Sequence, residues 1–519
     1  MKRSVVVTLV VAGVCGLVSA SGCAKKESKP AAPAKVSDDN KKTDSAAVPV
    51  DKGPELTPAN DKAATEAAKT DATAPAAEPA KTETPPAPPE PPAPPADEKK
   101  DEAKADAPPG AKIEKLPTEP IVEAAQPAAA AEEILLGIED LTKGIPGSGP
   151  VTIAEIQKWL DDPKNHIVLK PTLPMGLAVG AGQIAGLDAN PLTRAKIELG
   201  RQLYFDTRLS SDNSVSCASC HSPEFGYAKN TQFGVGTKGQ LGGRNSPVAY
   251  NRILSSVQFW DGRAATLEEQ AKGPIANPIE MSNTHDACIS CLGGVEGYKL
   301  QFERIFPGEG ITIDNVAKAI ASFERALVTG PSAWDYYESY KTFSDANKED
   351  LADLEALKKD DPAVYEKYEA LKKATDEHPI SDSAKRGGEI FFGEKGSCTA
   401  CHVGANFTDE KYHNLGVGMD KPEPDLGRFV ITKEEKDKGA FKTPTVRNVE
   451  LTGPYMHDGS QKTLEEVVEW YDKGGHPNQW LDEKIKPLKL TAEEKADLVA
   501  FMKSLTGPLP KVESGRLPE

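Results

Sequence analysis

Beyond residue 190 of this 519-residue chain, apolar positions recur at helical spacing. Hydrophobic residues three and four positions apart, the pattern of an amphipathic helix, occur in residues 191–205, 315–327, 464–471 and 492–505. Alternating runs of Val, Ile and Thr, which would indicate strands, are sparse. We therefore predict a mainly helical protein without large sheets, with Gly-, Pro- and Asn-rich loops between its helices.

Residues 348–377 form a further helical pattern of a different kind. Leu and Tyr residues recur at helical spacing among many Glu, Asp and Lys residues, and Pro362 interrupts the pattern. This predicts an exposed helical hairpin. A solvated connector between two domains is favoured over a docking surface, because charge runs of this kind usually face water.

The N-terminal pattern is that of an export signal. A basic start is followed by an apolar run and the small-residue box Ala20-Ser21-Gly22-Cys23, so residues 1–22 are predicted to be a signal peptide. Cys23 resembles the lipidated cysteine of a bacterial lipoprotein, although Ala20 stands where Leu is more common. No acidic residue follows Cys23, which resembles sorting to the outer membrane. We expect a periplasmic protein with a lipid anchor.

Residues 23–131 differ in composition from everything that follows them. They are rich in Ala, Pro, Lys, Glu and Asp and contain no aromatic residue, so they cannot bury enough apolar surface to offset the entropy of ordering. The Pro-rich run 85–95 favours extended polyproline II. The segment is predicted to be a disordered spacer, partly stiffened by its prolines.

Two Cys-x-x-Cys-His motifs identify the cofactor. They are Cys217–His221 and Cys398–His402, and each is a signal for covalent attachment of haem c, in which the His is an iron ligand. A zinc site or a redox dithiol is the alternative, but such sites favour paired Cys-x-x-Cys motifs or a thioredoxin-like context. We predict two covalently bound haems, with Cys217, Cys220, Cys398 and Cys401 as the attachment residues.

The two motifs divide the remaining chain into two regions. We predict an N-terminal haem domain at 132–340, a helical connector at 341–377 and a C-terminal haem domain at 378–519, each haem domain of cytochrome c type with extended loops. The formal net charge is −17. An acidic chain disfavours nucleic acid as a partner and favours a basic electron donor.

Further motifs give the chain a family resemblance. Taken in order with the haem motifs, six short runs resemble the bacterial di-haem cytochrome c peroxidase and MauG superfamily. The resemblance covers residues 186–510. The runs are 199–210, 243–247, 258–263, 273–281, 443–448 and 454–459. The resemblance implies that hydrogen peroxide is cleaved at the His221 haem and that electrons pass through the His402 haem. A periplasmic cytochrome c or cupredoxin, or a protein substrate, is the implied electron donor, and a homodimer is the implied assembly.

The resemblance also assigns catalytic residues. Glu280, twenty residues after Trp260, matches the family's catalytic glutamate, and a carboxyl suits this place because peroxide cleavage moves a proton from one oxygen to the other. Gln270 matches a glutamine of the peroxide pocket, and Trp260 matches the tryptophan between the haems. The alternatives are a surface glutamate and a core tryptophan.

A calcium ion between the haem regions is implied as well. Asn245, Thr452 and Pro454 match its protein ligands, one amide oxygen and two backbone carbonyls. Such hard oxygen donors suit calcium.

Two positions depart from the ordinary peroxidase pattern. Thr237 stands where peroxidases carry a His that closes the first haem in the resting enzyme, so we expect this haem to admit peroxide without prior reduction. Tyr471 stands where they carry a Met ligand to the second iron, and phenolate favours oxidised iron whereas thioether favours reduced iron. Tyr471 is predicted to be an iron ligand, a core tyrosine being the alternative. Both departures resemble MauG-type members.

Cys288 and Cys291 form one more Cys-x-x-Cys, but Leu292 follows where a third haem would need His. A structural or incidental pair is favoured over a redox site, with a disulfide or metal capture near His285 left open.

Three functions follow from these patterns. The first is a di-haem peroxidase that uses hydrogen peroxide as oxidant. The alternative is a MauG-like, peroxide-dependent oxidase of a protein or another electron-rich substrate. A non-enzymatic electron carrier is the third, and it would leave Glu280 without a role.

Overall fold

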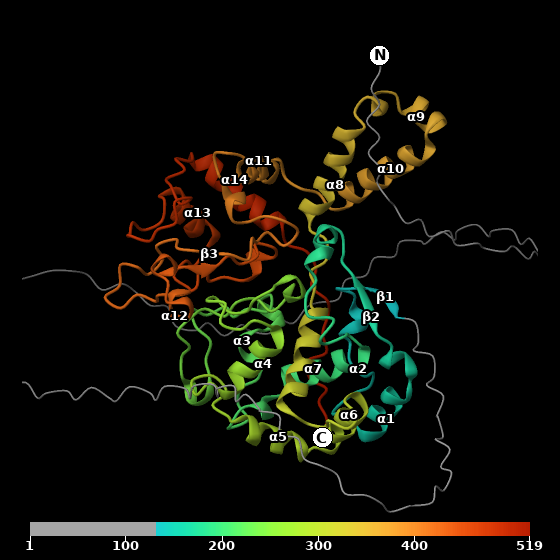
Figure 1. The fold of residues 1–519 in the computed structure, drawn as a ribbon. Helices are drawn as coiled ribbons and strands as arrows, with labels where there is room; N and C mark the ends of the chain where they lie inside the picture. The colour runs from blue at the N-terminus through green and yellow to red at the C-terminus, as the bar shows by residue number, and fades with distance from the viewer. Residues whose placement is uncertain (1–130) are drawn as a thin grey trace, which may run out of the picture. The chain divides into compact units, whose positions relative to one another are not determined.

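The computed structural model describes residues 131–519 (Figure 1). The predicted signal peptide, the lipidation site at Cys23 and all but the last residue of the predicted spacer lie outside the described residues. Among the described residues, no helix has the length and apolarity needed to cross a membrane.

Helices and loops make up most of the described chain, as predicted. The first seven helices are α1 Ile153–Asp161, α2 Arg194–Phe205, α3 Cys217–Cys220, α4 Leu267–Ala276, α5 His285–Gly293, α6 Glu296–Ile305 and α7 Ile313–Ala326. The second seven are α8 Ala333–Ala346, α9 Leu354–Asp360, α10 Pro362–Glu377, α11 Asp382–Phe392, α12 Phe429–Thr432, α13 Leu464–Asp472 and α14 Ala492–Ser504. The four predicted helices correspond to α2, α7, α13 and α14.

The strands form two small sheets. Strand β1, Glu132–Leu135, pairs in parallel with β2, Leu169–Thr172. Strand β3, Tyr412–His413, pairs antiparallel with β4, Phe441–Lys442. The described residues therefore contain no large sheet, which agrees with the sparse β pattern of the sequence.

A close helix crossing lies beside each haem motif. Helix α2 crosses α7 at Gly200, where an added Cβ would lie 1.9 Å from the carbonyl oxygen of Ala319. Helix α11 crosses α14 at Gly387, where it would lie 1.9 Å from the carbonyl oxygen of Asp497. Glycine is required at both positions because any side chain would overlap the facing backbone. In the chain, α2 precedes the first motif and α7 follows it. In the same way, α11 precedes the second motif and α14 follows it (Figure 1).

Two separate hydrophobic clusters accompany these helix pairs. The larger cluster includes Ile197 and Leu203 of α2 and Phe323 of α7. The smaller includes Phe391 of α11 and Phe501 of α14. Each cluster packs against one Cys of a haem motif, so each motif is supported by its own core.

The last residues of the chain return to the first cluster. The amide of Val151 donates to the carbonyl of Leu517 at 2.9 Å, and the buried Arg516 guanidinium donates to the carbonyls of Ile145 and Gly149. The C-terminus accordingly lies beside α1 and α6, which are far from it in the sequence, although it follows shortly after α14 (Figure 1). Residues 506–519, called the C-terminal strap below, thus connect the two parts of the structure.

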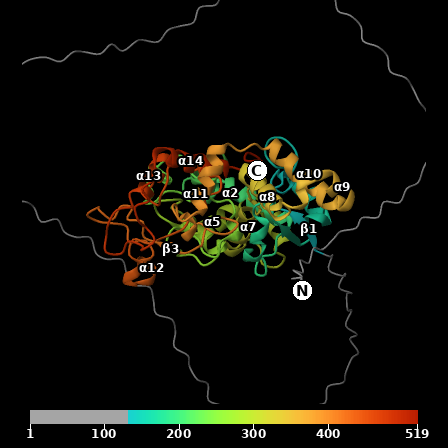
Figure 2. The same cartoon turned by 90° about the horizontal axis from the view of Figure 1, so that it is seen from above.

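The charged segment forms the predicted hairpin together with α8. Helix α10 packs against both α8 and α9, and most of its residues are exposed (Figure 2). Pro362 occupies the first position of α10, where the missing amide hydrogen costs nothing. Helix α8 runs from Ala333 to Ala346, so the domain boundary expected at residue 340 falls inside a continuous helix.

Candidate haem site

One cavity brings the two Cys-x-x-Cys-His motifs together. Its volume is about 660 Å³, and its walls include His221 and Cys220 of the first motif and His402, Cys398 and Cys401 of the second. The four motif cysteines and the Cys288–Cys291 pair considered above are all free thiols, without a disulfide between the motif cysteines. The thiols needed for two thioether links are therefore present at each motif.

Both motif histidines are oriented as iron ligands. His221 Nδ1 lies 2.8 Å from the carbonyl oxygen of Pro247, and His402 Nδ1 lies 3.0 Å from that of Phe407. Burial lowers the pKa of both imidazoles, which favours the neutral form. A neutral imidazole that donates from Nδ1 to a carbonyl leaves Nε2 as the metal ligand. This hydrogen bonding fits haem iron.

Cationic side chains on the cavity wall fit the carboxylates of haem. Arg252 donates to Gln258 and to the Val257 carbonyl, and among the described residues no carboxylate lies within ion-pair distance of it. Lys442 is buried beside Glu410 at 3.0 Å, and burial lowers its pKa to about 8. Buried cations require anionic partners, so the donor set of this cavity fits haem, whose propionates are anions.

Glu280 lies on the wall of the same cavity. Its Oε1 accepts a 2.7 Å hydrogen bond from Nδ2 of Asn277, which follows the end of α4. Burial raises the pKa of Glu280, and the Arg263 guanidinium partly opposes this effect. Gln270, on α4, also lines the cavity. The structure thus brings together the two residues that were predicted for peroxide chemistry.

The loop around Thr237 holds the backbone of Glu280. The Thr237 amide donates to the Glu280 carbonyl at 2.8 Å, and an added Cβ on Gly236 would lie 2.0 Å from the carbonyl oxygen of Ile279. The Thr237 side chain is fully buried and is not part of the cavity wall, and its hydroxyl has no hydrogen-bond partner. Thr237 therefore contributes no ligand atom to the cavity.

A second, smaller cavity of about 440 Å³ meets the first at Glu280. Phe259, Arg263, Pro274, Asn277 and Glu280 line both cavities. The guanidinium of Arg263 lies 3.5 Å from the centroid of the Phe259 ring. The carboxyl of Glu280 therefore lies between two spaces, a place from which a proton can be exchanged with either. Sequence analysis missed Asn277 and Arg263, although Asn277 lies only three residues before Glu280.

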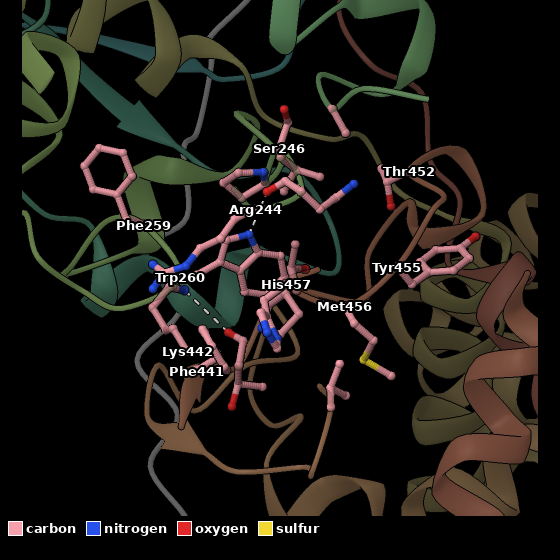
Figure 3. Close-up of a pocket in the computed structure, with 18 of the residues that line it drawn as sticks. Arg244, Ser246, Phe259, Trp260, Phe441, Lys442, Thr452, Tyr455, Met456 and His457 are labelled. Atoms are coloured by element: carbon pink, nitrogen blue, oxygen red, sulfur yellow. Dashed lines mark hydrogen bonds between the residues drawn. The ribbon is translucent and has the colours of Figure 1, made fainter. Parts of the chain in front are cut away.

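Trp260 joins the two halves of the cavity wall. Its indole Nε1 donates to the backbone carbonyl of Asn245 at 2.8 Å, and its own carbonyl accepts from the Lys442 amide at 2.8 Å. Figure 3 shows Trp260 near His457 and Phe441, whose rings stack with centroids 3.5 Å apart. Trp260 thus contacts one segment that follows the first motif, at Asn245, and one that follows the second, at Lys442.

The residues predicted to bind calcium also lie on this cavity. Asn245, Thr452 and Pro454 all contribute to its wall. Nδ2 of Asn245 donates to the carbonyls of Thr231 and Gln232, which fixes the orientation of the amide. The structure thus brings the three residues to one region.

Tyr471 lines the cavity on the side of the second motif. It lies on α13, on the same wall as Leu464, Val467 and Val468. Burial raises the pKa of its phenol well above the usual range, and the nearby Cys401 and Cys398 add to this effect. Iron ligation by Tyr471 stays a prediction, because a ferric ion would have to stabilise the phenolate against this burial.

A buried group that sequence analysis missed supports the second motif. Nδ1 of His413 lies 2.6 Å from Asp482, and its Nε2 lies 2.9 Å from Asp409. The Asp409 amide donates to the Cys401 carbonyl at 2.8 Å. Cys401, Asp409 and His413 lie close enough to share a metal ion, but Cys401 is one of the cysteines predicted to attach haem. The group therefore positions the haem loop.

Cys288 and Cys291 lie on α5, one turn apart. Cys288 is fully buried in the larger hydrophobic cluster, and both thiols are free. Nε2 of His285 lies 3.1 Å from the Lys272 carbonyl. Among the described residues, His285 and the two thiols do not form a group that could hold a metal, which favours the structural interpretation of this pair.

Two Cys-x-x-Cys-His motifs lie on one cavity, with imidazoles oriented for iron and a half-buried carboxyl on the same wall. These features define a di-haem c-type cytochrome with a catalytic pocket. A family model described as di-haem cytochrome c peroxidase matches residues 194–342. The MauG protein of Methylophilus methylotrophus, a methylamine utilization protein, is 33% identical over 64% of this chain and 88% of its own length. Cytochrome c551 peroxidase of Pseudomonas aeruginosa is 34% identical over 65% of this chain and 86% of its own length.

A solved structure agrees with these relatives. A MauG-like protein associated with microbial copper homeostasis is 29% identical, with a TM-score of 0.52 over 62% of this chain and 92% of that one. The chain belongs to the di-haem cytochrome c peroxidase and MauG family.

Proposed function

We propose that this protein is a peroxidase that reduces hydrogen peroxide at the His221 haem and receives electrons through the His402 haem. The observation that carries the proposal is the place of Glu280, a half-buried carboxyl on the walls of both the haem cavity and a second cavity. A carrier that only transfers electrons would not need such a group. The haems supply the redox chemistry, and the side chains of the pocket control proton movement and access.

Glu280 is the general acid and base of this proposal. A carboxylate at Glu280 accepts a proton from one peroxide oxygen and returns it to the other, which then leaves as water. Asn277 holds the carboxyl through the 2.7 Å bond to Oε1, so that Oε2 is left for peroxide. Gln270 orients the peroxide by a neutral hydrogen bond. Trp260 lies between the motifs and is proposed to carry electrons from one to the other.

The proposal includes finer assignments of cofactor and domain. Cys217, Cys220, Cys398 and Cys401 hold two haems c, and His221, His402 and Tyr471 ligate iron. The haem domains comprise residues 132–340 and 378–519, with residues 341–377 as connector. Each domain is supported by one helix crossing and one hydrophobic cluster.

A calcium ion held by Asn245, Thr452 and Pro454 completes the proposed cofactor set. Few charged ligands take part in this site, so water must complete the ion's shell.

A second candidate function is peroxide-dependent oxidation of a protein or another electron-rich substrate, as in MauG-type members. Tyr471 and Thr237 favour it, because phenolate stabilises oxidised iron and Thr237 leaves the first iron open. The periplasmic location, the lipid anchor at Cys23, a cytochrome c or cupredoxin donor and a homodimer rest on sequence patterns and the family resemblance alone.

The test is a spectrum of the oxidised, haem-loaded protein followed by turnover with peroxide. We expect one high-spin and one low-spin haem, and two low-spin haems would contradict an open first iron. Brisk peroxide-dependent oxidation of reduced cytochrome c would favour the ordinary peroxidase. Rapid reaction with peroxide without oxidation of cytochrome c would favour the second function. Two low-spin haems together with no reaction with peroxide would favour the third function, a non-enzymatic electron carrier.

A further inference from the structure

A continuous row of aromatic rings runs from the second motif towards the protein surface. The His402 and Phe391 rings lie 6.2 Å apart between centroids, and Phe391 lies 4.8 Å from Phe501. Phe501 meets the Trp334 ring edge-on at 4.7 Å, and Trp334 lies 5.5 Å from Tyr337. Trp334 is 6% exposed, whereas Tyr337 is only half-buried. The row therefore begins at an iron ligand and ends at solvent.

The backbone is shaped to hold the indole of Trp334. An added Cβ on Gly388 would lie 2.3 Å from the Trp334 ring, so no other residue at this position leaves room for the indole. Phe392 stacks on the same ring at 5.6 Å. The neighbouring Gly387 already serves the helix crossing, so the second glycine serves the tryptophan.

A buried ion pair fixes the start of α8, on which Trp334 and Tyr337 lie. Asp335 accepts two hydrogen bonds from Arg447, at 2.9 and 3.0 Å, and its side chain also caps the helix through Ser332. The pair is almost fully buried, with 2% and 5% of its side chains exposed. Such a pair holds one geometry, and the distance between Trp334 and the second motif is therefore fixed.

We propose that Trp334 and Tyr337 form a one-electron relay between the second haem and the surface, and that small phenols are oxidised at Tyr337. Tryptophan and tyrosine are the side chains that lose an electron most readily, while the two intervening phenylalanines provide contact without being oxidised. Lys385 lies 5.6 Å over the Tyr337 ring and pairs with Asp382. Tyr337 is half-buried under this cation, so only part of its ring meets solvent, and the proposed electron donor is a small phenol, not a protein.

The electron balance of the relay is complete. Peroxide takes two electrons and two protons and becomes two molecules of water. Each electron leaves Tyr337 by way of Trp334, and the Tyr337 phenol releases its proton to solvent. A phenol then restores Tyr337 by giving up one hydrogen atom. Two phenols are thus oxidised to phenoxyl radicals for each peroxide consumed.

The relay rests on the proposed function, because it requires oxidation of the haem-loaded protein by peroxide. The experiment mixes that protein with one equivalent of peroxide, without donor, and records the electron paramagnetic resonance spectrum of samples frozen within milliseconds. Incorporation of ring-deuterated tyrosine or tryptophan shows which type of residue carries the radical, and the variants below identify the residue. Oxidation of guaiacol by excess peroxide is measured in parallel.

We expect Trp334→Phe and Tyr337→Phe each to abolish the assigned tyrosyl radical. Each should slow guaiacol oxidation about tenfold, equivalent to about 1.4 kcal/mol in the barrier. Trp159→Phe is the matched control, because Trp159 packs against a different cluster, and it should change neither readout. Haem spectra and melting temperatures check that the variants fold, and phenylalanine preserves the ring packing.

The outcomes separate the two proposals. If the wild-type protein does not react with peroxide, the proposed function fails. If it reacts and Trp334→Phe retains the same radical and the same guaiacol rate, the relay alone is overturned. A radical that deuteration assigns to neither tyrosine nor tryptophan, or that persists in Tyr337→Phe, would also overturn it.

Discussion

The indole Nε1 of Trp260 donates a 2.8 Å hydrogen bond to the backbone carbonyl of Asn245. Asn245 is also the one side-chain ligand of the proposed calcium site, so the ion and the tryptophan between the motifs share a residue. The backbone N–H of Asn245 in turn donates to the backbone carbonyl of His457 at 2.7 Å. Any change in calcium occupancy should therefore reach Trp260.

Calcium removal is the first prediction. Chelation with EGTA should shift the fluorescence of Trp260 and slow electron transfer between the haems, and added calcium should reverse both effects. Asn245→Ala should reproduce the chelated state and no longer respond to calcium. Trp260→Phe identifies which part of the fluorescence change comes from Trp260. An unchanged spectrum and rate after chelation would remove calcium from the proposal.

Glu280 is expected to control the pH dependence of the peroxide reaction. Burial raises its pKa above the usual 4.5, and the step that accepts a proton from peroxide needs the ionised form. The rate should therefore fall as pH decreases through this raised pKa. Glu280→Gln should slow the reaction by about 10²–10⁴-fold and abolish this pH dependence.

Stopped-flow measurement of the oxidised protein with peroxide tests this prediction. Glu296→Gln is the control, because Glu296 lies at the surface in a pair with Lys299. A Glu280→Gln variant with the wild-type rate and pH profile would show that another group moves the proton.

Tyr471 is expected to set the potential of the second haem. Phenolate favours oxidised iron and thioether favours reduced iron, so Tyr471→Met should raise this haem's reduction potential by on the order of 100 mV. Tyr471→Phe, which supplies no ligand, should leave the iron five-coordinate. A spectroelectrochemical titration measures both. If neither variant changes the potential or the spin state, Tyr471 is a packing residue.

Sequence patterns predicted the parts of the structure that depend on neighbouring residues. The helix predicted at 191–205 is α2, which begins slightly later, at Arg194, because the Thr193 hydroxyl caps it by accepting from the Lys196 amide. The break in the hairpin follows from Pro362, as predicted. The haem motifs were likewise evident, because five consecutive residues carry the whole signal.

Contacts between distant residues could not be predicted in this way. His413 pairs with Asp482 across 69 positions, and Arg516 pairs with Glu155 across 361. No local pattern marks either pair. No local pattern marks Trp334 either, since the ring contacts that relate it to His402 come from α11 and α14.

His413 is expected to make stability depend on pH. Its pKa is raised to about 9 from 6.5, first by the Cys401 sulfur and also by Asp482 and Asp409. The thioether link removes the Cys401 contribution, and the two carboxylates still act in the same direction. The charged imidazole therefore stabilises the fold fully below pH 6.5, and this contribution is lost as pH rises through the raised pKa.

Chemical unfolding at several pH values measures the effect. His413→Asn should destabilise the haem-loaded protein by about 2 kcal/mol at pH 6, with a smaller difference once the pH exceeds the raised pKa of His413. His378→Asn is the control, because His378 is exposed and contacts only its own helix and Tyr336. An equal loss at both pH values would mean that the imidazole acts through packing alone.

The C-terminal strap is expected to couple the two hydrophobic clusters. Arg516 is 5% exposed and donates to the carbonyls of Ile145 and Gly149 and to the Glu155 carboxylate at 2.9 Å. Arg516→Ala leaves these acceptors without their donor and should cost about 3 kcal/mol. Arg304→Ala is the matched control, since the Arg304 pair with Asp161 is largely exposed and should be worth at most about 1 kcal/mol.

Cooperativity of unfolding distinguishes coupling from local stability. With the strap in place, urea unfolding followed by each haem's absorbance should give coincident transitions, because the strap links residues after α14 to the α1 region. Removal of residues 511–519 should separate the transitions and lower the midpoint of the His221 haem more than that of the His402 haem, since the strap packs on the first cluster. Coincident transitions in the truncated protein would show that the remaining contacts between the halves, such as Arg244 with Asp425 at 2.7 Å, couple them without the strap.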